Sequence, residues 1–234
     1  MDTKPRLLTI LDIITGVLFA IAVGMVFFYA PLEATMGEVQ RVFYFHVSSA
    51  WVGSLGFAVA LVAGILYLVK GDRKWDVVEV AAVEISLVFF FITIASGYIW
   101  SALAWHMTVW QAMEPRLATA AIVELVYAAY MLLRQGIEDP DRRARFGAIY
   151  VILGFVTVPL TFLSIRLLRS IHPVLFGPGS PNAQGDMAMT SEMYTTFFFS
   201  LFVFSVLFVD LLWHRIRLGR LASQVEQLRL KVTH

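Results

Sequence analysis

The stretch VSSAWVGSLGFAVALVAGILYLV, residues 47–69, decides the class of fold. It carries no charged residue and is long enough to cross a hydrocarbon core of about 30 Å, which takes roughly 20 helical residues. Small residues recur along it at helical spacing, a pattern that lets transmembrane helices approach one another closely. These small residues are Ser49 or Ala50, Gly53, Gly56, Ala60 and Ala63. The stretch therefore predicts a membrane-spanning helix packed tightly against a neighbour, and His46 at its start should point into the bundle.

Further apolar runs of similar length predict an all-α, polytopic integral membrane protein with six transmembrane helices. The predicted spans lie near residues 8–30, 47–69, 80–100, 117–134, 147–168 and 193–213. The composition agrees, because 59% hydrophobic and 15% charged residues are unusual for a soluble domain. The chain has no cysteine, which excludes disulfides, thiolate metal sites and iron–sulfur clusters within it. The net charge of +1, with scattered basic residues, gives no indication of nucleic-acid binding.

The basic residues predict how the chain lies in the membrane. If the N-terminus is cytoplasmic, all 18 Lys and Arg residues fall on the inner side except Arg41, Arg116, Arg166 and Arg169. By the positive-inside rule, both termini are then cytoplasmic. We therefore expect a multi-pass protein of the cytoplasmic (inner) membrane, with the lipid bilayer as its main surroundings.

The chain divides into a transmembrane domain, residues 1–213, and a cytoplasmic amphipathic tail, residues 214–234. In the tail, apolar residues recur at a spacing of three or four: Leu218, Leu221, Val225 and Leu228. Two heptads are too few to predict a coiled coil. A short helix on the inner membrane surface or on a partner subunit is compatible with this pattern.

Several polar or helix-breaking residues fall inside the predicted spans. Glu79, Glu84 and Glu124 are candidates for proton-relay groups, since intramembrane carboxylates are costly, or for structural, hydrogen-bonded carboxyls. Neither Glu84 nor Glu124 has an obvious cationic partner in the sequence. Pro159 should kink the fifth helix because it lacks an amide donor.

A tryptophan-rich segment, GYIWSALAWHMTVWQAMEPRLAT at residues 97–119, connects the third and fourth spans on the predicted outer side. It holds Trp100, Trp105 and Trp110. Such residues either anchor a protein at the bilayer interface or form the walls of a site for a large flat ligand. The segment therefore marks the outer face as the place to look for a site.

Three histidines, His46, His106 and His172, are assigned to the same side as the tryptophans, together with the four outer arginines. Haem needs this combination: axial imidazoles for iron, aromatic walls for the porphyrin, and Arg donors for the propionates. Three histidines would also satisfy zinc, although zinc needs no tryptophan. Residue types alone leave three hypotheses open: haem, an interfacial aromatic belt without a cofactor, and another metal or ligand.

Three outer segments resemble motifs of the haem exporter protein C (CcmC) family of cytochrome c maturation. RVFYFHVSSAW, residues 41–51, is similar to a first histidine motif close to Y-x-H-V-P-x-A-W, and RSIHPV, residues 169–174, is similar to the second. Between them the family carries a tryptophan-rich loop ending W-x-W-D-x-R-L-T. The corresponding residues here are Trp110 and Arg116, which are of the same type, Glu114 in place of Asp, and Met113 in place of Trp. Trp100 and Trp105 match the upstream tryptophans at a longer spacing, and the resemblance covers nearly the whole chain.

The resemblance implies a protein that binds haem b at the outer face of the membrane and delivers it to a membrane-anchored haem chaperone. It also implies work beside ATP-binding cassette transporter subunits of the cytochrome c maturation complex. Transport is implied rather than enzymatic catalysis, although such a protein would assist covalent haem loading of the chaperone. The implied axial ligands of the haem iron are His46 and His172. Other implied cofactor-binding residues are Trp100, Trp105, Trp110, Glu114 and Arg116.

Position alone adds further candidates for contact with haem. Arg41, Arg166 and Arg169 join Arg116 as candidates for the propionates, and His106 is a candidate contact within the tryptophan-rich segment. Arg166, Arg169 and His172 recur every three residues, so that neighbouring members would face one region if the helix continued to Pro173.

Two other classes of function stay open from the sequence. A b-type electron-transfer cytochrome usually holds haem between histidines deep in helices, whereas no histidine here is predicted mid-span. A solute permease without haem would show broken helices and polar sites at the midplane, for which Pro159, Glu84 and Glu124 are the indications.

Overall fold

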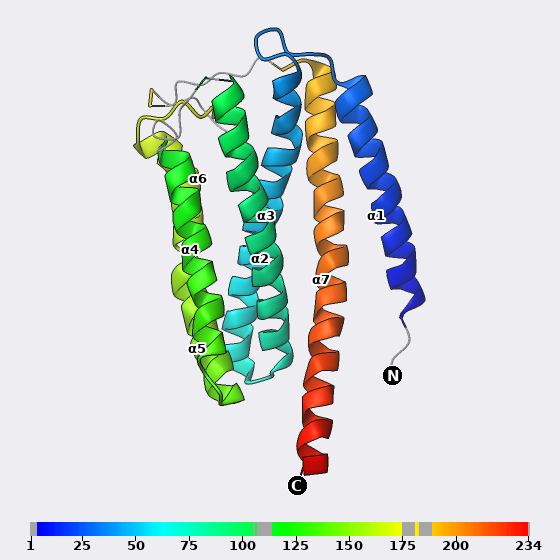
Figure 1. Cartoon of the computed structure of the whole chain (residues 1–234), viewed down its shortest axis with the longest axis vertical. Coiled ribbons are helices and arrows are strands. Elements are labelled where there is room, and N and C mark those ends of the chain that lie inside the picture. Colours follow the sequence, from blue (N-terminus) through cyan, green and yellow to red (C-terminus); the bar gives the residue numbers. More distant parts are fainter. Residues whose placement is uncertain (1–3, 105, 107–113, 175–180, 183–188, 234) are drawn as a thin grey trace.

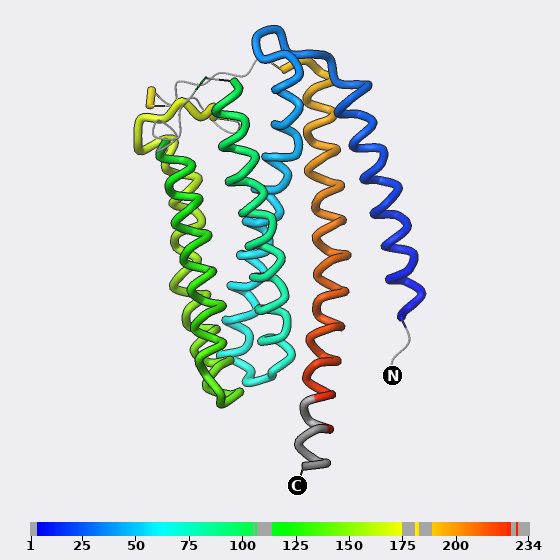
Figure 2. The backbone as a smooth tube through the Cα atoms, viewed as in Figure 1, coloured from blue at the N-terminus to red at the C-terminus, as the bar shows by residue number. Residues whose placement is uncertain are grey.

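The computed structural model describes residues 4–104, 106, 114–174, 181–182 and 189–233, which form helices with connections between them (Figures 1 and 2). In chain order the described elements are α1 (Arg6–Gly24), the π-helical turn η1 (Met25–Tyr29), the 3-10 turn η2 (Glu38–Arg41), α2 (Val42–Lys70), α3 (Lys74–Ala104), α4 (Pro115–Gln135), α5 (Pro140–Gly154), α6 (Thr157–Leu167) and α7 (Ser191–Thr233).

Six helical segments of the described chain are long and apolar enough to cross a membrane. They are Arg6–Tyr29, Glu38–Lys70, Lys74–Ala104, Pro115–Gln135, Pro140–Leu167 and Ser191–Val225. The all-α, six-span prediction is thus confirmed. Several helices are longer than predicted, because hydropathy detects only the apolar part of a helix whose polar ends continue beyond it. In particular, α7 runs unbroken from the last span to Thr233, so the predicted tail extends this helix.

The fifth span is interrupted between α5 and α6, as Pro159 predicts. Pro159 has no amide hydrogen to donate to the carbonyl oxygen of Phe155, four residues earlier. That oxygen accepts a shorter-range hydrogen bond from the amide of Val158 at 3.0 Å. The helix axis therefore breaks just before Pro159, and α6 starts as a separate helix.

The bundle is built around α2 and α3. Figure 1 shows α1 and α7 on one side of this pair and α4, α5 and α6 on the other. The predicted stripe of small residues on α2 is buried, and a Cβ added at Gly53 would lie 2.6 Å from Cδ2 of Phe90 on α3. Close approach of the two helices therefore requires glycine at this position. Below it, the rings of Phe57 and Tyr127 stack with centroids 3.8 Å apart and join α2 to α4.

The intramembrane carboxylates of α3 have partners that the sequence did not reveal. Glu84 accepts hydrogen bonds from the Nε and Nη2 atoms of Arg215 on α7, the latter at 2.8 Å. Glu79 is fully buried and accepts a hydrogen bond from Tyr130 Oη at 2.9 Å. Sequence distance hid the pair of Glu84 and Arg215, so the expectation that Glu84 lacks a cationic partner is wrong. For Glu124 the described chain offers no hydrogen-bond partner to the buried Oε2 atom.

One end of the bundle gathers the segments that the sequence marked as candidates for a site. The start of α2, the end of α3, the start of α4 and the end of α6 lie at this end (Figure 1). The α2–α3 and α4–α5 connections lie at the opposite end, toward which α1 begins and α7 ends. The two histidine-bearing segments are therefore neighbours in space, and the bundle is polarised along its long axis.

Candidate functional site

Two adjoining cavities at this end of the bundle share His46 and His172. The first, of about 610 Å³ including its mouth, lies among α2, α3, α4 and the segment after α6. The second, of about 1600 Å³ including its mouth, lies among α2, α6 and α7. Ala50 and Arg116 also line both cavities. The two predicted ligands, which are far apart in sequence, thus meet at one site.

His46 is held by α3 so that one ring nitrogen stays available. The side chain is buried, and its Nδ1 atom lies 3.0 Å from Ser96 Oγ. Ser96 Oγ donates its own hydrogen to the carbonyl oxygen of Ile92 at 2.6 Å, so it serves as the acceptor for an Nδ1–H donor. The lone pair of the neutral imidazole then belongs to Nε2. His46 therefore offers Nε2 as a ligand atom.

The ring of His46 also fits closely against α3. A Cβ added at Gly97 would lie 2.8 Å from His46 Cε1, which is closer than real Cβ contacts come. On the next turn, the buried Trp100 meets the His46 ring edge-on, with centroids 5.8 Å apart. Glycine at 97 makes room for the imidazole, and Trp100 forms one wall of the first cavity.

His172 reaches the cavities from the segment that follows α6. Its Nδ1 atom lies 3.0 Å from the carbonyl oxygen of Pro173, which can only accept a hydrogen bond. Nδ1 therefore carries the hydrogen, and Nε2 keeps the lone pair, as in His46. Burial, followed by the positive charge of Arg116 and the His46 ring, lowers the pKa of His172 from 6.5 to about 3. The imidazole is thus neutral at physiological pH.

Glu114 connects the segment carrying His172 to the start of α4. Its Oε2 atom caps this helix by accepting hydrogen bonds from the amides of Arg116 at 2.8 Å and Leu117 at 3.3 Å. Its Oε1 atom accepts a hydrogen bond from Ser170 Oγ, which in turn accepts one from the amide of His172 at 3.0 Å. Glu114 therefore acts on the site by fixing two backbone segments, besides lining the first cavity.

Two of the four candidate arginines line the cavities. Arg116 donates to the carbonyl oxygen of Thr161, and its guanidinium carbon lies 4.4 Å from the centroid of the Phe162 ring. Arg166 lines the second cavity. Arg41 instead forms an ion pair with Glu38 at 2.5 Å. It also donates a hydrogen bond to the carbonyl oxygen of Val26, near the end of the first span. Of the described lining residues, neither cavity includes Arg41 or Arg169.

The remaining predictions divide into those the structure describes and those it does not. Trp105 and Trp110 lie outside the described residues. His106 is exposed, has a positive φ of 51°, and is not among the described residues that line either cavity. The expected helical relation of Arg166, Arg169 and His172 is wrong, because α6 ends at Leu167 and Leu168 is extended. His172 is positioned by the hydrogen bonds of its own segment instead.

Sequence reasoning missed Ser96, Gly97 and Ser170. Ser96 and Gly97 follow the bulky run FFFITIA in α3, and such a pair of small residues is typical of a close approach between transmembrane helices. That signal could have pointed to this part of α3 as the partner of His46. Nothing in the sequence marks Ser170, whose role depends on a hydrogen bond to a residue far away along the chain.

The donor set and the walls of the cavities fit haem. Two imidazole Nε2 atoms are the axial ligands that haem iron takes, and Arg116 and Arg166 are suited to carboxylates such as the propionates. The second cavity is walled mainly by apolar side chains, among them Val47, Phe198 and Phe202. A cavity with apolar walls and a few polar groups is the usual form of a cofactor site.

Comparison with known proteins identifies relatives of this chain. The model of the family described as "Heme exporter protein C" (CcmC) matches residues 1–231. Heme exporter protein C of Rhodobacter capsulatus is 27% identical over 239 residues, covering 99% of this chain and 91% of that protein. Heme exporter protein C of Escherichia coli (strain K12) is 27% identical over 194 residues, covering 82% and 74%. A putative cytochrome c biosynthesis ccmC-like mitochondrial protein of Marchantia polymorpha is 23% identical over 196 residues, covering 81% of each chain.

These matches support a role in haem handling for cytochrome c biogenesis. The six spans and the two histidine-bearing segments occur in one continuous match along the chain. The chain therefore belongs to the CcmC (Heme exporter protein C) family of multi-pass membrane proteins.

Proposed function

We propose that this protein binds haem b at the outer face of the cytoplasmic membrane, with His46 and His172 as axial ligands, and delivers it to a membrane-anchored haem chaperone. The observation that carries the proposal is that both histidines line the same two cavities. Each has its Nδ1 atom engaged by an acceptor, so that Nε2 is available to iron. Hydrogen bonds of this kind fix the tautomer and orientation of histidines that bind metals.

The remaining residues of the site have complementary roles. Arg116 and Arg166 would bind the propionates, and Trp100 would cover part of the porphyrin. The apolar side chains of the second cavity, such as Phe198 and Phe202, would exclude water from the macrocycle. Glu114 would hold the segment of His172 in place through Ser170.

Delivery to a partner fits the position of the site at one end of the bundle (Figure 1). The chaperone would take the haem there, with this protein assisting its covalent attachment. The chain would work with ATP-binding cassette subunits of a haem exporter complex, because its own sequence contains no segment that resembles a nucleotide-binding loop.

The ligand assignment is tested by absorption spectra of the detergent-purified protein, oxidised and reduced, beside His46→Ala and His172→Ala variants. We expect a low-spin spectrum in the unaltered protein and loss of haem, or a five-coordinate spectrum, in each variant. His106→Ala is the matched control, because this exposed histidine does not line the described walls of the cavities. Unchanged spectra in His46→Ala and His172→Ala would refute the assignment.

Delivery is tested separately by mixing the haem-loaded protein with a purified haem chaperone and following which protein carries haem after separation. Transfer to the chaperone supports the proposal. A haem that stays on this protein and cycles reversibly at a fixed potential with quinol would instead indicate an electron-transfer cytochrome.

A further inference from the structure

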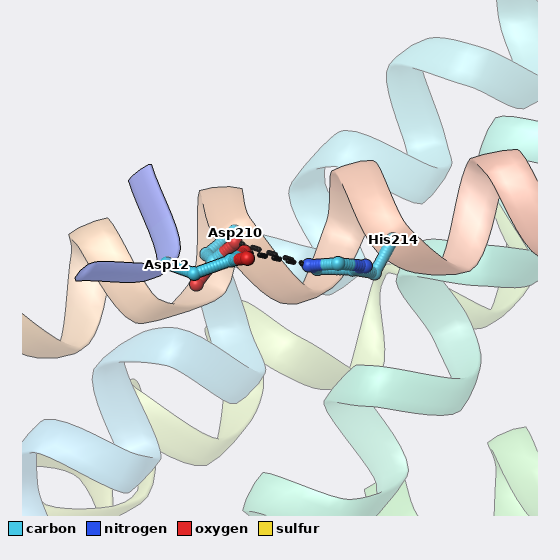
Figure 3. Close-up of side chains that lie close together, drawn as sticks. All are labelled: Asp12, Asp210 and His214. Carbon is cyan, nitrogen blue, oxygen red and sulfur yellow. Dashed lines mark hydrogen bonds and ion pairs between the residues drawn. The ribbon is translucent and has the colours of Figure 1, made fainter. Parts of the chain in front are cut away.

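A second cluster of ligand-type side chains lies away from the histidine cavities, between α1 and α7. Figure 3 shows Asp12 of α1 together with Asp210 and His214 of α7. One ligand atom of each residue lies within 4.8 Å of the other two. His214 Nε2 is 2.7 Å from Asp12 Oδ1 and 3.6 Å from Asp210 Oδ1. Three potential ligand atoms from two helices therefore face one another.

The cluster arises from helix geometry on both sides. Asp210 and His214 are four residues apart on α7 and so lie on the same face. α1 buries only a narrow stripe, Leu8, Thr15 and Ala22, and it packs against α7. Asp12 follows Leu8 by one turn, so this packing brings its carboxylate to the face of α7 that carries Asp210 and His214.

The charges of the cluster leave one buried carboxylate oxygen without a hydrogen-bond donor. Asp210 is only 7% exposed, and its Oδ1 atom has no hydrogen-bond partner among the described residues. Asp12 is paired with Lys4 through its other oxygen, Oδ2, which leaves Oδ1 directed to His214. A buried carboxylate beside a second carboxylate is costly unless a cation or hydrogen-bond donor compensates it. The Nε2 atom of His214 carries at most one hydrogen, and Asp12 Oδ1 is the closer acceptor for it.

We propose that Asp12, Asp210 and His214 form a binding site for a divalent transition-metal ion that joins α1 to α7. In a tetrahedral site with bonds of 2.0–2.2 Å, ligand atoms are about 3.4 Å apart. The two separations from His214 Nε2, 2.7 and 3.6 Å, lie on either side of this value, and the two carboxylate oxygens lie within 4.8 Å of each other, so side-chain rotations can bring all three atoms to one ion. The ion would replace the proton shared by Asp12 and His214 and would also bind the otherwise unsatisfied oxygen of Asp210.

The ligand set indicates which ions fit. One imidazole nitrogen and two carboxylate oxygens suit Zn²⁺, Fe²⁺, Co²⁺ or Mn²⁺. Mg²⁺ and Ca²⁺ prefer oxygen ligands throughout, and Cu⁺ prefers sulfur. The His214 side chain is 45% exposed, which leaves room for a water molecule as a further ligand and for exchange of the ion.

The test uses the full-length, haem-free protein in detergent, in a His46→Ala/His172→Ala background that removes the histidines of the other site. Zinc bound at equilibrium is measured by mass spectrometry after dialysis, and the Tm is measured with and without Zn²⁺. We expect one zinc equivalent and a rise in Tm, both of which are lost in Asp210→Asn and in His214→Arg. His214→Arg places a cation beside the carboxylates but cannot bind a metal, so an unchanged Tm without zinc shows that the fold is intact.

His106→Gln is the matched control, because it removes a histidine that is exposed and distant in sequence from the cluster, and it should keep the zinc equivalent. Zinc binding that persists in both Asp210→Asn and His214→Arg overturns the proposal. If the variants fail to fold, the test is the absorption spectrum of the His46→Ala/His172→Ala protein loaded with Co²⁺. Visible d–d absorption of a low-symmetry nitrogen and oxygen site supports the proposal, and its absence overturns it. These outcomes do not depend on whether the protein binds haem.

Discussion

At the level of single residues, two small neighbours on α3 leave the Nε2 atom of His46 available as a ligand atom. Ser96 engages the Nδ1 atom of His46, and Gly97 leaves the space that the imidazole ring occupies. Neither residue would contact haem iron. Both act as positioning residues, because they determine which nitrogen of His46 faces the cavity and where the ring lies.

Gly97→Ala should therefore weaken haem binding without disrupting the bundle. The added Cβ would lie 2.8 Å from His46 Cε1, so the ring must move away from the position that Ser96 fixes. We expect haem affinity to fall by about tenfold or more, which corresponds to roughly 1.4 kcal/mol, with unchanged helix content by circular dichroism. Gly16→Ala is the control, since no described atom lies within 4 Å of a Cβ at that position. Equal haem affinity of Gly97→Ala and Gly16→Ala would contradict the role given to Gly97.

The pKa of His172 predicts how the haem-free protein responds to acid. The folded pKa of about 3 lies below the unfolded value of about 6.5, so the folded protein binds fewer protons between these values. The stability that neutral His172 allows is complete above pH 6.5 and is lost progressively as the pH falls toward 3. At pH 5 this loss is at most about 2 kcal/mol, and solvent screening of the partly exposed side chain reduces it.

The measurement is the free energy of unfolding of the haem-free protein between pH 7 and pH 4, beside the His172→Gln variant. Glutamine removes the titrating group, so the variant should lose less stability on acidification than the unaltered protein. Parallel pH profiles for the two proteins would show that His172 titrates alike in the folded and unfolded states.

At the level of elements, the start of α4 and the segment after α6 depend on one side chain. Glu114→Ala removes the N-cap of α4, which should lower the free energy of unfolding by about 1 kcal/mol. It also releases Ser170 and with it the segment of His172, so haem affinity should fall as well. Ser170→Ala should reproduce the loss of affinity with a smaller effect on stability, because the cap stays intact.

Asp139→Ala is the matched control for this element. Asp139 caps α5 at the other end of the bundle, where its side chain accepts a hydrogen bond from the amide of Arg142 at 2.7 Å. This variant should lose similar stability and keep haem affinity. If Glu114→Ala and Asp139→Ala affect haem equally, the effect of Glu114 is a general loss of stability and not a local one.

Sequence patterns predicted the elements better than the contacts between them. The six spans follow from hydropathy, which is local, and the buried face of α2 follows from the spacing of its small residues. The pair of Glu84 and Arg215 could not be predicted, because it depends on α3 lying beside α7. The end of α6 at Leu167 could not be predicted either, because it also depends on residues that are distant in the sequence. Ser170 forms hydrogen bonds with Asn182 and Glu114, and these compete with continuation of the helix.

The candidate site shows the same division. The gathering of His46, His172, Trp100 and Arg116 at one end of the bundle was predictable, because imidazoles, tryptophans and arginines are rare enough in a membrane protein to mark a place where they occur together. The tautomer of His46 and the support of His172 were not predictable. They rest on Ser96 and Ser170, and serine is too common a residue to stand out in a sequence.

At the level of the whole molecule, the bundle has two unlike ends. The histidine cavities lie at one end, and the α2–α3 and α4–α5 connections lie at the other, toward which α1 begins and α7 ends (Figure 1). Most basic residues fall in segments of the second end, including Arg73 and Lys74 beside the α2–α3 connection. The positive-inside rule then predicts that this end faces the cytoplasm and that the cavities open on the outer side.

The absence of cysteine from the sequence allows a direct test of this orientation. His106→Cys places a single thiol at an exposed residue just after the end of α3, and Asp72→Cys places one in the exposed α2–α3 connection. A maleimide that cannot cross membranes should label His106→Cys in intact spheroplasts and should label Asp72→Cys only after the spheroplasts are lysed. Each variant serves as the control for the other, because Asp72 precedes the first residue of α3 and His106 follows its last residue. The reverse labelling pattern would place the cavities on the cytoplasmic side, where a haem chaperone anchored outside could not reach them. That result would refute delivery to the chaperone, even if His46 and His172 bind haem.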